Sequence, residues 1–73
     1  MITILNPVVK DGIATADIKI YSSCCKTTLK VLAHYSNGIF SDAINIDTGA
    51  TIYIAVQQDL IKEWLKYLNE HST

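Results

Sequence analysis

Residues 27–46 read TTLKVLAHYSNGIFSDAINI, and this stretch decides the fold. Asn37-Gly38 is a strong signal for a two-residue β-hairpin loop, because both residue types tolerate positive φ. With that loop, three apolar pairs face each other across two strands: Tyr35–Phe40, Val31–Ile44 and Leu29–Ile46. These six side chains then share one side of the sheet, as a correct register requires.

Asp42 is the exception on this apolar side. A buried carboxylate requires hydrogen-bonding partners or a raised pKa. Three explanations stay open from the sequence: a satisfied carboxylate at the sheet edge, a functional acid, or an error in the register.

Other turn signals extend the pairing in both directions. Asp11-Gly12 as a loop sets Leu5 against Ile18 and Val9 against Ala14. Taking Cys24-Cys25 as the next loop sets Ile20 against Leu29 and Ile18 against Val31, and Asp47-Thr48-Gly49 closes a last hairpin. We therefore expect strands at about 2–9, 13–21, 27–36, 39–46 and 50–56. A helix from Ser23 to Gly38 is the alternative, which Thr27, Thr28 and Val31 disfavour.

The last part of the chain, residues 57–71, predicts a helix. Its apolar residues recur with a period of 3.6, at Leu60, Ile61, Trp64, Leu65 and Leu68. Asp59 is a candidate N-cap, and the spacing places Trp64 in the core. The predicted fold is α+β, a five-stranded antiparallel β-meander with one C-terminal α-helix packed on one face, in a single domain spanning residues 1–73.

Composition disfavours several classes of function. The 73 residues carry a net charge of −1, with six lysines and no arginine, whereas sequence-specific DNA binders show a basic excess. No window approaches the ~18 apolar residues that span a bilayer, and no signal peptide is visible. We expect a cytoplasmic protein without membrane association.

The two cysteines, Cys24 and Cys25, are the most conspicuous residues for chemistry. Adjacent cysteines lack the spacing of a redox motif, and with one distant histidine they fall short of four metal ligands. We expect reduced thiols in a turn, no metal and no cofactor, with a redox or metal role left open. His34 lies on a strand without a nucleophile motif nearby, so we expect no enzyme.

The outer side of the predicted sheet, away from the helix, carries more apolar side chains than expected of a face exposed to solvent. Exposed apolar patches mark interaction surfaces. The predicted partner-binding residues are Ile2, Ile4, Lys19, Tyr21, Lys30, Leu32, His34 and Tyr53, with Lys19 directly opposite Lys30. The first strand is also an apolar edge that can pair with another chain.

These features predict a small, non-enzymatic protein-interaction module that contacts a protein partner, or a second copy, through the outer face or an edge strand. One concrete version is an inhibitor of a larger complex, of the anti-defence type encoded by phages or mobile elements; this rests on size alone. The alternative is nucleic-acid or anionic-ligand binding on the outer face.

Overall fold

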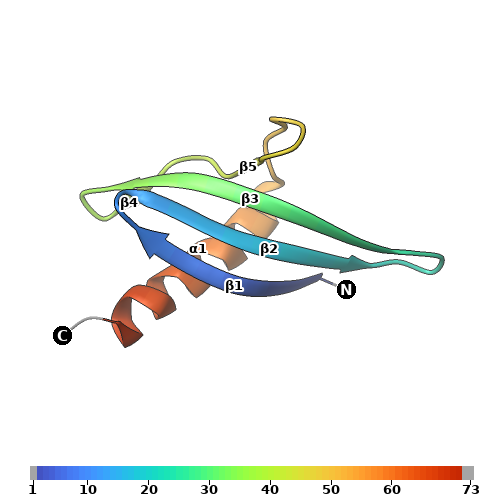
Figure 1. Cartoon of the computed structure of the whole chain (residues 1–73), viewed down its shortest axis with the longest axis horizontal. Helices are drawn as coiled ribbons and strands as arrows, with labels where there is room; N and C mark the ends of the chain where they lie inside the picture. Colours follow the sequence, from blue (N-terminus) through green and yellow to red (C-terminus); the bar gives the residue numbers. More distant parts are fainter. Residues whose placement is uncertain (1, 72–73) are drawn as a thin grey trace.

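The computed structural model describes residues 2–71. Its elements are β1 (Ile2–Lys10), β2 (Ile13–Tyr21), β3 (Lys26–Ser36), β4 (Ile39–Phe40), β5 (Ile44–Asn45) and α1 (Ile54–Glu70). Three long antiparallel strands lie side by side, and α1 crosses one face of the sheet (Figure 1). The predicted α+β class, with an antiparallel sheet and one C-terminal helix, is confirmed, and β3 excludes the helical alternative.

The sheet departs from a simple meander at its last two strands. The strand order is β1-β2-β3-β4, and β5 also pairs with β3. The expected single strand 39–46 is therefore wrong, because residues 41–43 interrupt it. The two short strands β4 and β5 share one edge of β3.

This interruption shifts the register by one residue. Tyr35 pairs with Phe40 as predicted, but Ile44 then pairs with Leu32, so the predicted Val31–Ile44 and Leu29–Ile46 pairs are wrong. A one-residue shift exchanges the two faces. Ala43 is consequently 1% exposed while Asp42 is exposed, and the register error explains the apparent buried carboxylate.

A second irregularity lies in β1. Val9 pairs with Ala14 as predicted, but the register shifts between Leu5 and Val8, so that Ile4, and not Leu5, faces Ile18. The insertion falls on Asn6-Pro7, where Asn6 has φ 53° and Pro7 has no N–H for the ladder. Such a bulge re-aims every side chain before it.

The β2–β3 hairpin has a longer loop than Cys24-Cys25 alone. Tyr21 pairs with Lys26, which leaves Ser22–Cys25 as the loop, and Ile20 faces Thr27 instead of Leu29. This shift of two residues keeps every side chain on its expected face. It also replaces the predicted Lys19–Lys30 pair by Asp17–Lys30, which are opposite charges.

The predicted strand 50–56 is absent. Thr51 forms one isolated bridge with Ile44, and the helix begins at Ile54, with Tyr53 and not Asp59 at its N-cap. The earlier start places Gln57 in the first turns of α1, where its side chain is buried. Its Oε1 accepts a hydrogen bond from the Ala43 N–H at 3.2 Å, and its Nε2 donates to the Ile52 carbonyl at 2.6 Å.

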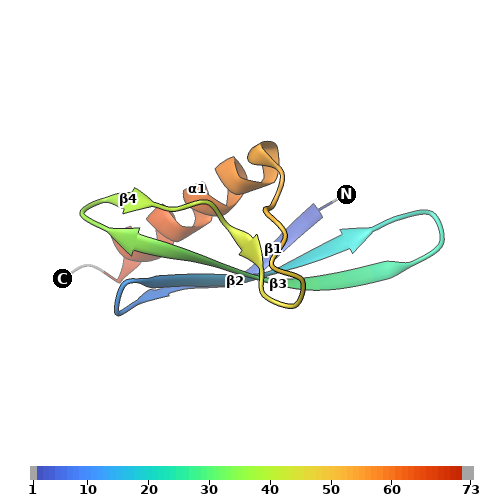
Figure 2. The ribbon, with the colours of Figure 1, turned by 90° about the horizontal axis from the view of Figure 1, so that it is seen from above.

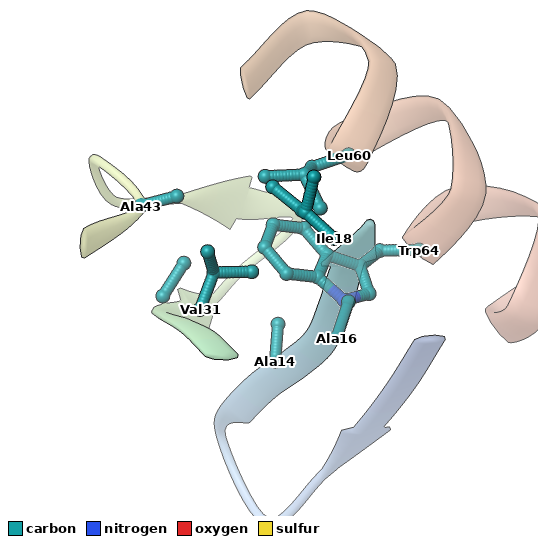
Figure 3. Packing of buried hydrophobic residues seen from close by; sticks show 8 residues of the cluster. Ala14, Ala16, Ile18, Val31, Ala43, Leu60 and Trp64 are labelled. Carbon is teal, nitrogen blue, oxygen red and sulfur yellow. The ribbon is translucent and has the colours of Figure 1, made fainter. Parts of the chain in front are cut away.

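Trp64 lies at the centre of the core, as predicted, and is 0% exposed. Its indole lies over small residues of β2, with Leu60 and Val31 alongside (Figure 3). The buried alanines of the sheet leave room for this ring: Ala14, Ala16, Ala33 and Ala43. The indole N–H donates to the Thr15 carbonyl at 2.9 Å, which satisfies its only polar group.

Candidate functional site: an apolar groove and the outer sheet face

The structure separates the predicted partner-binding residues between the two sides of the sheet. By their register with β2, Ile2 and Ile4 lie on the helix side, so their predicted place on the outer face is wrong; the β1 bulge is the reason. Tyr53 lies in the connection into α1 and on no strand. The remaining five alternate on the outer face of β2 and β3: Lys19, Tyr21, Lys30, Leu32 and His34.

On the helix side, an apolar groove of about 450 Å³ lies between the sheet and the start of α1. Its floor is formed by Ile2, Ile18, Ile20 and Leu29, and its wall by Asn45, Ala50, Thr51, Ile52, Tyr53 and Val56. We refer to these ten residues as the apolar groove. Its volume falls in the range of ligand-binding clefts, and its lining is largely aliphatic.

The groove exists because α1 covers only part of the sheet. The β2–β3 hairpin extends well past the start of the helix (Figures 1 and 2), and we call its residues 19–28 the hairpin arm. At the groove, the Tyr53 side chain is 85% exposed, and the neighbouring Ile54 is 73% exposed. Two large side chains so exposed beside an apolar concavity are typical of an interaction surface.

An unpaired strand edge borders the groove. On that side of β3, pairing with β5 involves Val31 and Leu32, and the Lys30 carbonyl accepts from the Ile46 N–H at 2.9 Å. Because the hydrogen-bonding groups of a strand alternate in direction, those of Thr28 and Lys26 also point outward. This stretch of β3 is an open edge within the described part of the chain.

The outer face carries two rows of side chains that run across the strands. One row is Val8, Thr15, Leu32 and Ile44; the next is Leu5, Asp17, Lys30 and Ile46. We call these eight residues the outer patch. Both rows end in aliphatic side chains, and Val8 and Ile46 are among the exposed large hydrophobic residues. The second row holds opposite charges at its centre, and the Asn6 side chain donates to the Asp17 carboxylate at 3.2 Å.

The outer face of the hairpin arm is basic. Lys19 and Lys26 lie on it, and the Lys26 ammonium is 5.7 Å from the centre of the Tyr21 ring. No acidic residue occurs between Asp17 and Asp42 in the sequence, so this arm is a local positive region.

His34 and Ser41 are joined by two hydrogen bonds, both of which use the His34 backbone. The His34 N–H donates to the Ser41 hydroxyl at 2.7 Å, and the Ser41 N–H donates to the His34 carbonyl at 2.8 Å. These bonds hold the chain as it leaves β4.

Cys24 and Cys25 are free and exposed at the tip of the hairpin arm. The Cys25 thiol donates to the Cys24 sulfur at 3.1 Å, and this hydrogen bond lowers the pKa of Cys24. The Ser22 hydroxyl, at 3.9 Å from the Cys24 sulfur, makes a smaller contribution in the same direction. The thiol–thiol hydrogen bond raises the pKa of Cys25, because Cys25 is the donor. The hydrogen bond between the two sulfurs therefore favours the thiolate form at Cys24 over that at Cys25.

Within residues 2–71, no three His, Cys, Asp or Glu side chains gather as a metal-binding group. The helix that the structure describes is too short and too polar to cross a membrane. Searches of protein-family models, curated proteins and solved structures give no match to this chain.

Several residues of these surfaces and of the core were not predicted from the sequence. Ile44 and Ile46 join the outer patch, and Gln57 joins the core, only because of the shift after residue 40. The one local signal was Asp42 on an apolar face, for which a register error was one of three explanations that the sequence left open.

Proposed function

We propose that this chain is a non-enzymatic protein-interaction module that binds an extended segment of a partner protein in the apolar groove. The observation that supports the proposal is the exposed aromatic ring of Tyr53 at an aliphatic concavity, bordered by an open strand edge. Aromatic anchors beside apolar pockets dominate the binding energy of many interfaces.

The alternation of a β-strand defines the chemistry of the segment. A strand added along Lys26 to Leu29 points every second side chain toward the groove, where Leu29 and Ile20 lie. The intervening side chains point toward the outer face, beside Lys26 and Lys19. The preferred partner segment therefore alternates aliphatic and acidic residues.

A module of this kind acts by occupying a surface, and inhibition of a larger assembly is the version that we propose. It needs no chemistry from the module, since covering a partner's strand edge is sufficient to block it. We propose the cytoplasm as its compartment, where exposed thiols such as those of the hairpin arm stay reduced.

The test uses a synthetic peptide that alternates glutamate and isoleucine, added to the ¹⁵N,¹³C-labelled full chain and followed by NMR. Binding should shift the amide signals of Lys26 and Thr28 and the methyl signals of Ile20 and Leu29. A peptide with lysine in place of glutamate should bind at least about tenfold more weakly, because like charges then meet. Equal shifts with both peptides, or shifts elsewhere on the chain, would contradict the proposal.

Tyr53→Lys is the variant that should abolish binding, since it places a charge at the groove. Ile39→Lys is the matched control, because Ile39 is 71% exposed on β4 and does not line the groove. Both positions are exposed, so both variants should fold as the parent does. If Ile39→Lys weakens binding as much as Tyr53→Lys, the groove is not the site.

The basic outer face of the hairpin arm favours a second candidate function, binding of single-stranded nucleic acid. Lys19, Lys26 and the Tyr21 ring are the residues that would contact phosphates and stack on a base. Fluorescence anisotropy with labelled DNA and RNA oligonucleotides tests it, and the affinity should fall steeply with salt. No change in anisotropy at ~20 mM salt would exclude this candidate.

A further inference from the structure

The outer patch is related to itself by a simple rotation. Consider a two-fold axis parallel to the strands, running between β2 and β3 just above the outer face. This axis places β2 of one copy over β3 of the other, and β1 over β5. Each row of the patch is then laid, reversed, over the same row of the second copy.

Reversal makes both rows complementary. In the row that contains Asp17, Asp17 meets Lys30 of the second copy, and Leu5 meets Ile46. In the neighbouring row, the aliphatic ends Val8 and Ile44 meet each other. The middle of that row sets Thr15 against Leu32. No like charges face each other in either row.

A perpendicular two-fold axis and a pairing of two β1 edges are both less favourable. A two-fold axis perpendicular to the strands sets Asp17 against its own copy, or against Thr15 when the axis lies between the rows. Pairing two β1 edges is obstructed, because Asn6 bulges out of the strand and Pro7 offers no N–H.

The sheet leaves room for the two patches to overlap. The molecule measures 43 × 23 × 18 Å, and both rows of the patch cross the middle of β2 and β3. Packing of the outer faces would also form an aligned β-sandwich, in which strands of two sheets run nearly parallel.

We infer that the outer patch is the interface of a symmetric homodimer, in which Asp17 pairs with Lys30 of the second copy and aliphatic contacts surround this pair. The interface is isologous, because the same patch serves both copies. It lies on the opposite side of the sheet from the apolar groove, which remains open in each copy.

Charge exchange tests the pairing by sedimentation velocity. The wild-type chain should sediment as a dimer, whereas Asp17→Lys and Lys30→Glu should each weaken the dimer roughly 100-fold, since each creates two like-charge contacts. An equimolar mixture of these two variants should form a heterodimer, in which both contacts again join opposite charges. A stable dimer of the double variant is also expected.

The mixture distinguishes charge contacts between the two copies from charge contacts within one chain. Each single variant keeps a like-charge pair across β2 and β3, and mixing cannot repair it. Recovery of the dimer on mixing therefore reports contacts between copies alone. A wild-type monomer at ~200 µM, single variants that still dimerise as the wild type does, or a mixture that stays monomeric would each overturn the inference.

A second measurement needs no variant. Val8 and Ile44 of one chain lie on β1 and β5, which β2 and β3 separate by about 14 Å at ordinary strand spacing. A nuclear Overhauser effect between their methyl groups, isotope-filtered in a mixture of labelled and unlabelled wild-type chains, can arise only between copies. Its presence supports the inference, and its absence in a sample that sediments as a dimer places the interface elsewhere.

Discussion

At the scale of single residues, the two adjacent cysteines have identical side chains but different roles in one hydrogen bond. Both are fully exposed at the tip of the hairpin arm, yet one donates a hydrogen bond and the other accepts it. Acceptance stabilises the thiolate of Cys24, and donation stabilises the thiol form of Cys25. No disulfide or metal is needed for this asymmetry.

We predict that iodoacetamide alkylates Cys24 before Cys25. Because the pKa of Cys24 is lowered, its reaction should begin at a lower pH than that of an unperturbed cysteine. Cys25→Ala removes the main donor and should return the onset to a higher pH, which peptide mass spectrometry after timed quenching measures. Equal rates at both positions in the wild-type chain would contradict this assignment.

Gln57 is the residue whose side chain ties the end of the sheet to the start of the helix. Gln57→Leu keeps the volume but leaves the buried Ala43 N–H without an acceptor, and we expect a loss of about 1–3 kcal/mol in the free energy of unfolding.

Gln57→Glu should be more stable at pH 4 than at pH 7. Its carboxylate would face the Ile52 carbonyl, so its folded pKa should be raised and stability lost as pH rises. Urea denaturation at both pH values measures this, and a Gln57→Glu variant more stable at pH 7 would refute it.

At the scale of elements, two one-residue irregularities determine which side chains reach the core. The Asn6-Pro7 bulge turns Ile4 inward, and the break at residues 41–43 turns Ala43 inward and Asp42 outward. Each changes the face of every residue on one side of it.

The break between β4 and β5 is tested by a pair of neighbouring substitutions. Ala43→Asp places a carboxylate in the core without a partner and should cost about 4 kcal/mol or more, enough to unfold a domain this small. Asp42→Ala, at an exposed position, should change the free energy of unfolding by less than about 0.5 kcal/mol. Thermal denaturation followed by circular dichroism compares the two variants. If Asp42→Ala loses more stability than Ala43→Asp, the data would support the predicted unbroken strand 39–46 instead.

The elements differ in how much of them was predictable. Val9–Ala14 and Tyr35–Phe40 lie next to tight turns, where Asp-Gly and Asn-Gly define the register, and both pairs are correct. The β2–β3 register is wrong from its turn onward, because its loop is Ser22–Cys25 and no Asn-Gly or Asp-Gly marks it. The other errors begin farther from a turn, because a bulge leaves hardly any local signal. The expected strand 50–56 failed for another reason: its apolar residues serve the groove and the start of α1.

At the scale of the whole molecule, a single short helix covers one side of a sheet that is longer than the helix. Two surfaces remain. The apolar groove lies on the helix side, where α1 does not cover the sheet, and the outer patch contains both an acidic residue, Asp17, and a basic residue, Lys30. These surfaces lie on opposite sides of the sheet (Figure 2 shows α1 on one side only).

We therefore predict that the two surfaces act independently. Tyr53→Lys should leave the sedimentation coefficient of the wild-type chain unchanged, and Asp17→Lys should leave the affinity for the glutamate–isoleucine peptide within about twofold, since additivity holds for distant sites. Isothermal titration calorimetry with each variant measures the second effect. A variant that changes both properties would mean that the groove and the outer patch are coupled.

The amino-acid sequence by itself determined the α+β class, the three long strands, the helix and the place of Trp64, because hydrophobic periodicity and Gly-containing turns are local signals. Only the tertiary structure decided that Ile2 and Tyr53 meet in one groove and that Leu5, Ile44 and Ile46 frame the Asp17–Lys30 pair. The physical reason is the period of a strand. One inserted residue moves every side chain on one side of it to the other face of the sheet, and the residues of the strand itself give hardly any signal of the insertion.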